Sequence, residues 1–184
     1  MKIAILGWGS LIWRPENLSV KSEWLLGGPY LPIEFARISS DGRLTLVVKT
    51  GATEIQTMYA ISKFETLDEA VFDLAVREGC GKNKIGYCIK NVEVNPNNFN
   101  SRNNLISWLN DKDDIDAVIW TNLSANFKEK IDIELNNQNA VNYLKYLPQD
   151  VQAKAEEYIR KAPAIVNTPI RRAIEVGLGW KIIV

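Results

Sequence analysis

The first apolar run of the chain, residues 2–6, is followed at once by the pair Gly7 and Gly9. A Gly-x-Gly pair after a strand is typical of dinucleotide-binding loops, but that motif needs a third glycine where this chain has Ile12, and a helix that begins there. The next predicted elements are strands, and no βαβ crossover follows. The sequence therefore argues against an open parallel sheet of the dinucleotide-binding type.

Periodicity and turn residues predict an α+β chain. The expected strands are 2–6, 31–38, 43–49, 55–61, 85–94, 115–121 and a short terminal strand at 181–184. Thr66 and Glu69 match a capping box that opens a helix over 66–78, and further helices are expected over 101–109 and, two or three in number, over 137–178. We expect the strands to curl into a mixed, barrel-like β-sheet flanked by helices.

Composition limits the class of protein. The chain has 184 residues, of which 46% are hydrophobic and 24% charged, which suits one domain over 1–184. Basic and acidic residues balance at 22 each, so we expect neither a nucleic acid nor a membrane as partner. No apolar stretch approaches the roughly 20 residues of a membrane span and no secretory leader is evident, so we expect a cytoplasmic protein.

The chain contains no histidine. This excludes Ser-His-Asp and Cys-His catalytic groups and histidine-based metal sites. The two cysteines, Cys80 and Cys88, lack the second pair of ligands that a zinc site needs, so no metal is expected and both are interpreted as ordinary thiols. An enzyme with this composition must move protons through a carboxylate, a lysine, a tyrosine or a thiol.

The loop after the first strand combines backbone freedom with two indole rings. The backbone N–H groups of Gly9, Ser10 and Leu11 could converge on an anionic group such as a carboxylate. Gly9 would then serve a left-handed backbone or the close approach of a ligand. The alternative is a tight turn that places Trp8 and Trp13 in the core, and spacing alone leaves both interpretations open.

Helical spacing singles out Glu78. The next position on the buried stripe of the 66–78 helix is Glu78, after Leu67, Ala70, Val71, Leu74 and Ala75. Its carboxyl is therefore expected to point inward, where desolvation raises a carboxyl pKa toward the range useful for acid/base work. The other charges of this helix are expected off the stripe, at Asp68, Glu69, Asp73 and Arg77. The alternatives for Glu78 are a frayed last turn or an ion pair with Arg77 or Arg37.

Three motifs, in the same order along about residues 1–125, resemble the γ-glutamylcyclotransferase superfamily. The stretch LGWGSLIWRPENL is similar to the Tyr-Gly-Ser-Leu-Ile-Trp motif of its ChaC-type branch, matched directly at Gly9, Ser10, Leu11, Ile12, Trp13 and Pro15. AVREGC resembles the Val-Arg-Glu segment, which carries the family's acid/base onto Glu78. LPIEFARIS followed by RLTLVV is similar to the second motif and carries its arginine onto Arg37. Tyr143, in NYLKYL, is similar to the tyrosine of a late Tyr-Leu pair.

The resemblance implies a γ-glutamylcyclotransferase-like fold and a reaction. These enzymes release 5-oxoproline when the α-amine of a γ-glutamyl compound attacks its own γ-amide carbonyl, and they use no nucleophilic side chain, metal or cofactor. The implied partner is a small γ-glutamyl substrate whose α-carboxylate lies on the N–H groups of residues 9–11, with Glu78 as general acid/base. The implied binding residues are Trp8, Gly9, Ser10, Leu11, Ile12, Trp13, Arg37 and Tyr143.

Two departures bear on specificity. Trp8 stands where the family motif has a tyrosine, and Val151 stands where some cyclotransferases carry a substrate-contacting tyrosine. Two alternatives stay open: a non-catalytic module that binds a small ligand on the same scaffold, and a thiol enzyme that uses Cys80 with Lys82 or Lys84 as its activator. The sequence specifies neither the leaving amine nor the oligomeric state.

Overall fold

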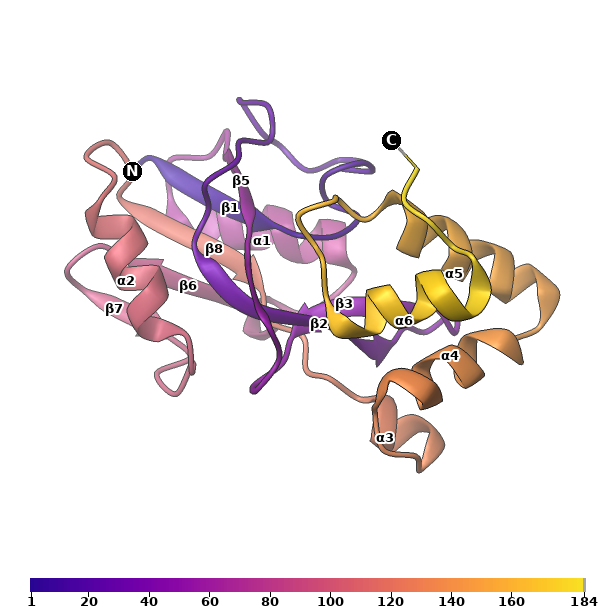
Figure 1. Cartoon of the computed structure of the whole chain (residues 1–184). Coiled ribbons are helices and arrows are strands. Elements are labelled where there is room, and N and C mark those ends of the chain that lie inside the picture. Colours follow the sequence, from indigo (N-terminus) through magenta and orange to yellow (C-terminus); the bar gives the residue numbers. More distant parts are fainter. Residues whose placement is uncertain (184) are drawn as a thin grey trace. The chain divides into compact units, whose positions relative to one another are not determined.

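A computed structural model describes residues 1–183 and confirms the α+β class (Figure 1). The chain forms two compact units, each made of two stretches. The first unit comprises Met1–Leu31 and Gln56–Leu123, and the second comprises Pro32–Ile55 and the chain from Ser124 onward. The expected single domain over 1–184 stays a prediction.

The first unit contains a mixed five-stranded sheet in the order β5-β1-β8-β6-β7. Its strands are β1 (Ile3–Gly7), β5 (Met58–Ile61), β6 (Ile85–Ile89), β7 (Glu93–Asn95) and β8 (Ala117–Thr121). β1 pairs parallel with β8, and the other neighbours pair antiparallel. The sheet ends at β5 and β7, and the strands of residues 1–183 form no closed barrel. The prediction of a mixed sheet is thus confirmed, and the prediction that this sheet curls into a barrel is wrong.

The barrel does not form because the hairpin strands pair elsewhere. β2 (Tyr30–Ile38), β3 (Leu44–Val48) and β4 (Glu54–Gln56) make a separate three-stranded sheet in the order β3-β2-β4. The predicted strand 55–61 is broken at Thr57, whose backbone N–H and hydroxyl both donate to the Pro29 carbonyl, at 3.1 and 2.9 Å. β4 and β5 therefore belong to different sheets. The predicted strand 85–94 is likewise the hairpin β6–β7, with Asn91 left-handed at its turn (φ 59°).

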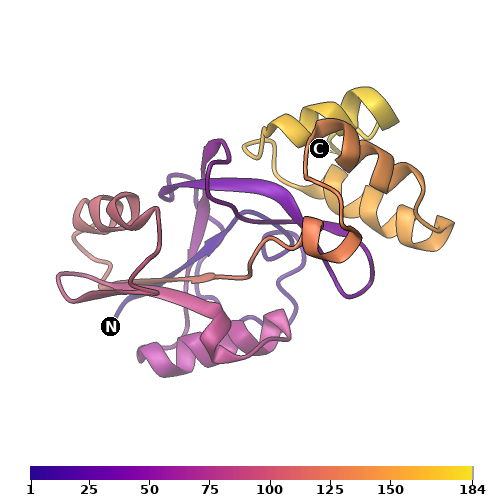
Figure 2. The ribbon, with the colours of Figure 1, turned by 90° about the horizontal axis from the view of Figure 1, so that it is seen from below.

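Two helices cover opposite faces of the five-stranded sheet (Figure 2). α1 (Leu67–Glu78) packs its alanines and leucine on one face, against Ile3, Ile5, Ala117 and Ile119. α2 (Arg102–Asn110) lies on the other face, where Phe99 packs on Trp120 with ring centroids 4.8 Å apart. As predicted, Thr66 caps α1 by accepting from the Glu69 N–H at 3.4 Å, and Gly79 ends it in the left-handed region. The one-turn helix η1 (Lys82–Lys84) follows.

The second unit carries the remaining helices. They are α3 (Phe127–Ile131), α4 (Asn137–Lys145), α5 (Gln149–Lys161) and α6 (Pro169–Leu178), which confirms the helices expected over 137–178. α5 packs on β3, where the Leu46 N–H donates to the Tyr158 hydroxyl at 3.3 Å. No helix within residues 1–183 has the length and apolar character needed to cross a membrane.

The expected terminal strand is wrong over 181–183, and its last residue, Val184, lies outside the described residues. The Ile183 N–H donates to the Arg160 carbonyl at 2.9 Å, and Arg160 Nε donates to the Lys181 carbonyl at 3.0 Å. This segment is therefore bonded to α5 and not to a sheet.

Candidate functional site

The parallel pairing of β1 with β8 brings their carboxyl ends to one edge of the sheet. Ile5 lies opposite Ile119, and the same register continued by two residues places Gly7 level with Thr121. Because side chains alternate along a strand, Thr121 follows Ala117 and Ile119 on the face that α1 covers. The loop that follows β1 begins at this edge, and α1 ends there at Glu78.

The loop forms a compact turn. The Ile12 N–H donates to the Gly9 carbonyl at 3.0 Å, and the Arg14 N–H donates to the Ser10 carbonyl at 2.8 Å. Among residues 1–183, Gly9 is not one of the positions with positive φ, so a left-handed backbone is not what this glycine supplies; the loop's left-handed residue is Glu16 (φ 53°). The backbone N–H groups of residues 9–11 donate no hydrogen bond to another backbone carbonyl within residues 1–31 and 56–123.

Some side chains of the loop are buried in the core, and others lie at the candidate site. Trp8 and Leu11 are buried, at 6% and 7% exposure, and Leu11 belongs to the core beneath α1. Ile12 and Trp13 are half-buried. The Ser10 hydroxyl meets the last turn of α1, where it accepts from Arg77 Nη2 at 3.2 Å. The core interpretation thus holds for the Trp8 ring.

Arg77 and Glu78 form a largely buried ion pair, with 9% and 15% of their side chains exposed. Arg77 Nη1 donates to Glu78 Oε1, and Nη2 also donates to the Arg14 carbonyl at 2.7 Å. The Nε atom of Arg77 is buried without a hydrogen-bond partner. Arg77 is not among the stripe residues of α1 buried against the sheet, but its side chain is largely buried because the last turn of α1 also packs against the loop.

Burial raises the pKa of the Glu78 carboxyl, which is the direction that helical spacing predicts. The charge and hydrogen bonds of Arg77 lower this pKa, as does the Thr121 hydroxyl, whereas the charge of Glu16 raises it. The Thr121 hydroxyl is close enough to act on the carboxyl but lacks the geometry of a hydrogen bond, since Oγ1 is buried and unpartnered. Burial prevails, so Glu78 holds its proton more tightly than an ordinary glutamate.

Sequence reasoning did not single out Thr121. The sequence nevertheless contains a hint. Thr121 is the last residue of the predicted strand 115–121, and the alternation of side chains along a strand places it on the same face as the strand's core residues Ala117 and Ile119. That hint acquires meaning only once β8 is known to run parallel to β1.

Two residues carried over by the resemblance belong to the second unit. Arg37, half-buried on β2, donates from Nη1 to the Ser124 carbonyl at 2.7 Å. The Tyr143 hydroxyl donates to the Gly42 carbonyl at 2.7 Å, and its ring packs edge-on against Phe127. Val151 lies near the same turn, with Cγ1 3.0 Å from where a Cβ on Gly42 would stand. These contacts give Arg37 and Tyr143 structural partners, and their expected roles in substrate binding stay predictions.

The two thiols form no disulfide. Cys80 is half-buried against the core beneath α1, and burial raises the pKa of the Cys88 thiol, which favours its neutral form. The Lys82 ammonium, proposed as an activator of Cys80, pairs with Asp68 at 2.8 Å.

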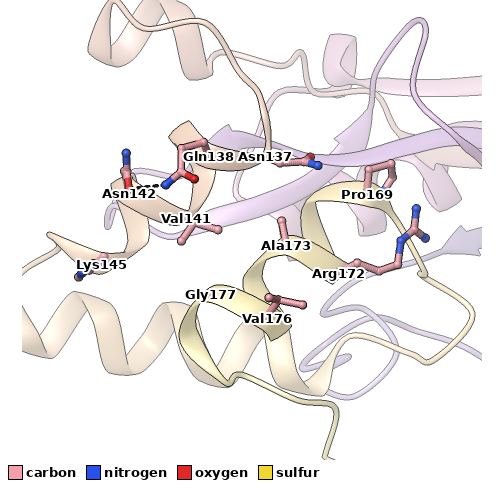
Figure 3. Close-up of a pocket in the computed structure, with 10 residues that line it drawn as sticks. All are labelled: Asn137, Gln138, Val141, Asn142, Lys145, Pro169, Arg172, Ala173, Val176 and Gly177. Carbon is pink, nitrogen blue, oxygen red and sulfur yellow. Dashed lines mark hydrogen bonds between the residues drawn. The ribbon is translucent and has the colours of Figure 1, made fainter.

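The second unit also carries an open groove of about 560 Å³ between α4 and α6 (Figure 3). Its lining is mostly amide and aliphatic, with Gln138 donating to Asn142 at 2.9 Å and Val176 88% exposed. Lys145 and Arg172 contribute its positive charges. None of the residues predicted for the site lines this groove.

Comparison with known proteins assigns no relative. No family model, no curated protein and no solved structure matches the chain. The cluster of Ser10, Arg77, Glu78 and Thr121 at the edge of the five-stranded sheet is therefore the observation on which a function is argued.

Proposed function

We propose that the protein is a γ-glutamylcyclotransferase-like enzyme, with a fold related to that superfamily, that releases 5-oxoproline from a γ-glutamyl amine, amino acid or peptide. One observation carries the proposal. Glu78 is a largely buried carboxylate with a raised pKa, and it lies beside the loop whose sequence resembles the family's first motif. A general base works best when its pKa lies near the working pH, and burial moves Glu78 in that direction.

In the proposed reaction Glu78 takes a proton from the substrate's α-ammonium. The freed amine forms a bond to the γ-carbonyl carbon and closes a five-membered ring. The bond from that carbon to the amide nitrogen then breaks as Glu78 returns the proton to that nitrogen, and the second proton of the ring nitrogen passes to the released amine, which leaves as an ammonium ion. No co-reactant is consumed, and the carboxylate ends in the state in which it began.

The loop has a complementary role in this scheme. The N–H groups of Gly9, Ser10 and Leu11 would bind the substrate's α-carboxylate, which is the negative group nearest the reacting amine. Because nucleophile and electrophile lie in one molecule, holding the substrate curled can supply up to about 7–11 kcal/mol of the barrier reduction. Arg77 ties this loop to Glu78, since one guanidinium bonds Ser10, the Arg14 carbonyl and the carboxylate.

A second function is a non-catalytic module that binds a small ligand at the same place. The Arg77–Glu78 ion pair favours it, because it gives the carboxylate a structural partner and so accounts for its burial without catalysis. In this case Glu78 would be dispensable for ligand binding and no product would form.

The experiment that separates the two functions is incubation of the protein with a panel of γ-glutamyl amines, amino acids and peptides, with 5-oxoproline detected by mass spectrometry. Release that depends on Glu78 supports the cyclotransferase. A γ-glutamyl ligand that raises the melting temperature while no compound of the panel releases 5-oxoproline supports the binding module.

A further inference from the structure

The Thr121 hydroxyl is buried and has no hydrogen-bond partner within residues 1–183. A buried polar group left unpaired costs about 1–3 kcal/mol, so such groups in native proteins call for an explanation. A threonine at the end of a strand could satisfy its hydroxyl by turning to water, yet the Oγ1 atom is enclosed. The enclosed hydroxyl therefore keeps its hydrogen-bonding capacity unused in this arrangement of residues 1–183.

The surroundings of Thr121 indicate what that use is. It follows Ile119 on the α1 side of β8 and lies opposite Ile85 of β6, so its face is lined by aliphatic side chains. The polar group beside it is the carboxyl of Glu78. In the resting arrangement Arg77 occupies Oε1 of that carboxyl. The charged groups that act on Glu78 are Arg77 of its own helix and Glu16 of the loop, whereas β8 contributes the uncharged Thr121.

We propose that Thr121 is a positioning residue for Glu78: its hydroxyl is a second partner that donates to the ionised carboxylate and accepts from the carboxyl once it is protonated. A hydroxyl suits both tasks because it carries one donor and two acceptor lone pairs. The inference rests on the proposed function, in which Glu78 gains and loses a proton in each turnover.

The need for a second partner follows from the proton cycle. When Glu78 takes up the substrate's proton it becomes neutral, so its attraction to Arg77 weakens and it carries an O–H donor that must find an acceptor. Thr121 can accept that hydrogen bond until the leaving nitrogen arrives. When the carboxylate forms again, the hydroxyl rotates and donates. Arg77, which has donors only, cannot accept at any stage.

The test compares Thr121→Val, which removes the hydroxyl but keeps a β-branched side chain of the same shape, with Thr121→Ser, which keeps the hydroxyl. The first readout is the ¹³C resonance of the Glu78 carboxyl followed against pH, assigned by its loss in Glu78→Gln. In Thr121→Val the titration midpoint should rise, because the hydroxyl bonds the charged carboxylate more strongly than the neutral carboxyl. In Thr121→Ser it should stay close to the wild-type midpoint.

The second readout is the pH dependence of kcat/KM for 5-oxoproline release. Its acid limb should move upward in Thr121→Val and be restored in Thr121→Ser, while KM at high pH changes little because Thr121 acts through Glu78. If Thr121→Val does not fold, Thr121→Ala removes the same hydroxyl for the same comparison.

The outcomes separate the two proposals. Identical Glu78 titrations in the wild type and in a variant without the hydroxyl would overturn the role of Thr121, even if the enzyme releases 5-oxoproline. A wild-type protein that releases no 5-oxoproline from any compound would overturn the proposed function. In that case the carboxyl titration still reports whether Thr121 bonds to Glu78.

Discussion

The guanidinium of Arg77 and the carboxylate of Glu78, consecutive in the chain, form a largely buried ion pair at the last turn of α1. One helix face cannot hold two consecutive side chains, so the pair is buried only because the loop after β1 covers Arg77 while the sheet edge covers Glu78. The pairing leaves Glu78 with a raised pKa, since burial outweighs the neighbouring cation. The ion pair therefore holds the Glu78 carboxyl in place while its pKa stays above the ordinary value.

The first prediction concerns Glu78→Gln. Glutamine keeps the size of the side chain but cannot accept the ammonium proton, so turnover should fall by about 10²- to 10⁴-fold while γ-glutamyl ligands still bind. The measurements are 5-oxoproline release under saturating substrate and ligand affinity by calorimetry. Full activity in the folded variant would remove Glu78 from the mechanism.

The matched control is Cys80→Ser, two residues away. It should leave turnover nearly unchanged, because the proposed reaction forms no bond to sulfur. A loss of activity in Cys80→Ser together with full activity in Glu78→Gln would favour a thiol enzyme.

The second prediction concerns the cation beside Glu78. Arg77 lowers the pKa of this carboxyl, so Arg77→Met should raise that pKa further. A base works in its ionised form, so the acid limb of the kcat/KM profile should move to higher pH. Arg77→Lys keeps the charge and should leave the limb near its wild-type position. Identical pH profiles for Arg77→Met and Arg77→Lys would show that the charge at position 77 does not affect the pKa of Glu78.

Arg77→Met should also destabilise the protein. Removing one partner of a buried ion pair leaves the other uncompensated, at a cost of up to about 3–5 kcal/mol. Urea unfolding at neutral pH measures this cost. A free energy of unfolding equal to that of the wild type would mean that the pair contributes nothing to stability.

The third prediction concerns Gly9. Its backbone is buried in the turn whose N–H groups are proposed to bind a carboxylate, so a side chain there should block the approach of the ligand. Gly9→Val is expected to abolish ligand binding and Gly9→Ala to weaken it. Circular dichroism checks the fold and calorimetry the affinity. Wild-type affinity in a folded Gly9→Val would leave the carboxylate site without support.

The fourth prediction concerns Glu34, a buried carboxyl of the second unit. It accepts from the Phe35 N–H at 2.8 Å, from the Thr168 hydroxyl, and from the Ile170 N–H at 3.4 Å at the start of α6. Burial raises its pKa above the ordinary value of 4.5, because desolvation outweighs these hydrogen bonds. The native state therefore binds the proton more tightly than the unfolded chain does.

The sign of the pH effect follows. The contribution of Glu34 to the free energy of unfolding is greatest below pH 4.5 and falls as the pH rises through the raised pKa. Glu34→Gln cannot titrate, so the difference between wild type and variant should shrink across this window in urea unfolding series. A difference that stays constant or grows with pH would contradict a raised pKa for the Glu34 carboxyl.

The helix over 66–78 shows what local pattern can predict. Its cap at Thr66 and its extent to Glu78 depend on groups within a few residues of one another, and both are confirmed. The low exposure of the Glu78 side chain, 15%, agrees with the inward direction that the stripe predicts. The turn at residues 39–42 is of the same kind, because the Gly42 N–H donates to the Ser39 carbonyl at 3.0 Å. The missing histidines are equally a property of the sequence alone, and they restrict any proton transfer to the remaining titratable groups.

Only the tertiary structure decided which distant segments meet. The division of the predicted strand 55–61 between two sheets depends on Pro29, the burial of Arg77 depends on Ser10 and Arg14, and Thr121 becomes a neighbour of Glu78 because β8 lies parallel to β1. The physical reason is that strand pairing and ion-pair burial join groups that are far apart in the sequence. The periodic pattern of a segment shows which face is apolar but not which of several possible distant segments will pair with it. The sequence determined which carboxyl of the 66–78 helix is the candidate base, and the fold determined the neighbours that shift its pKa.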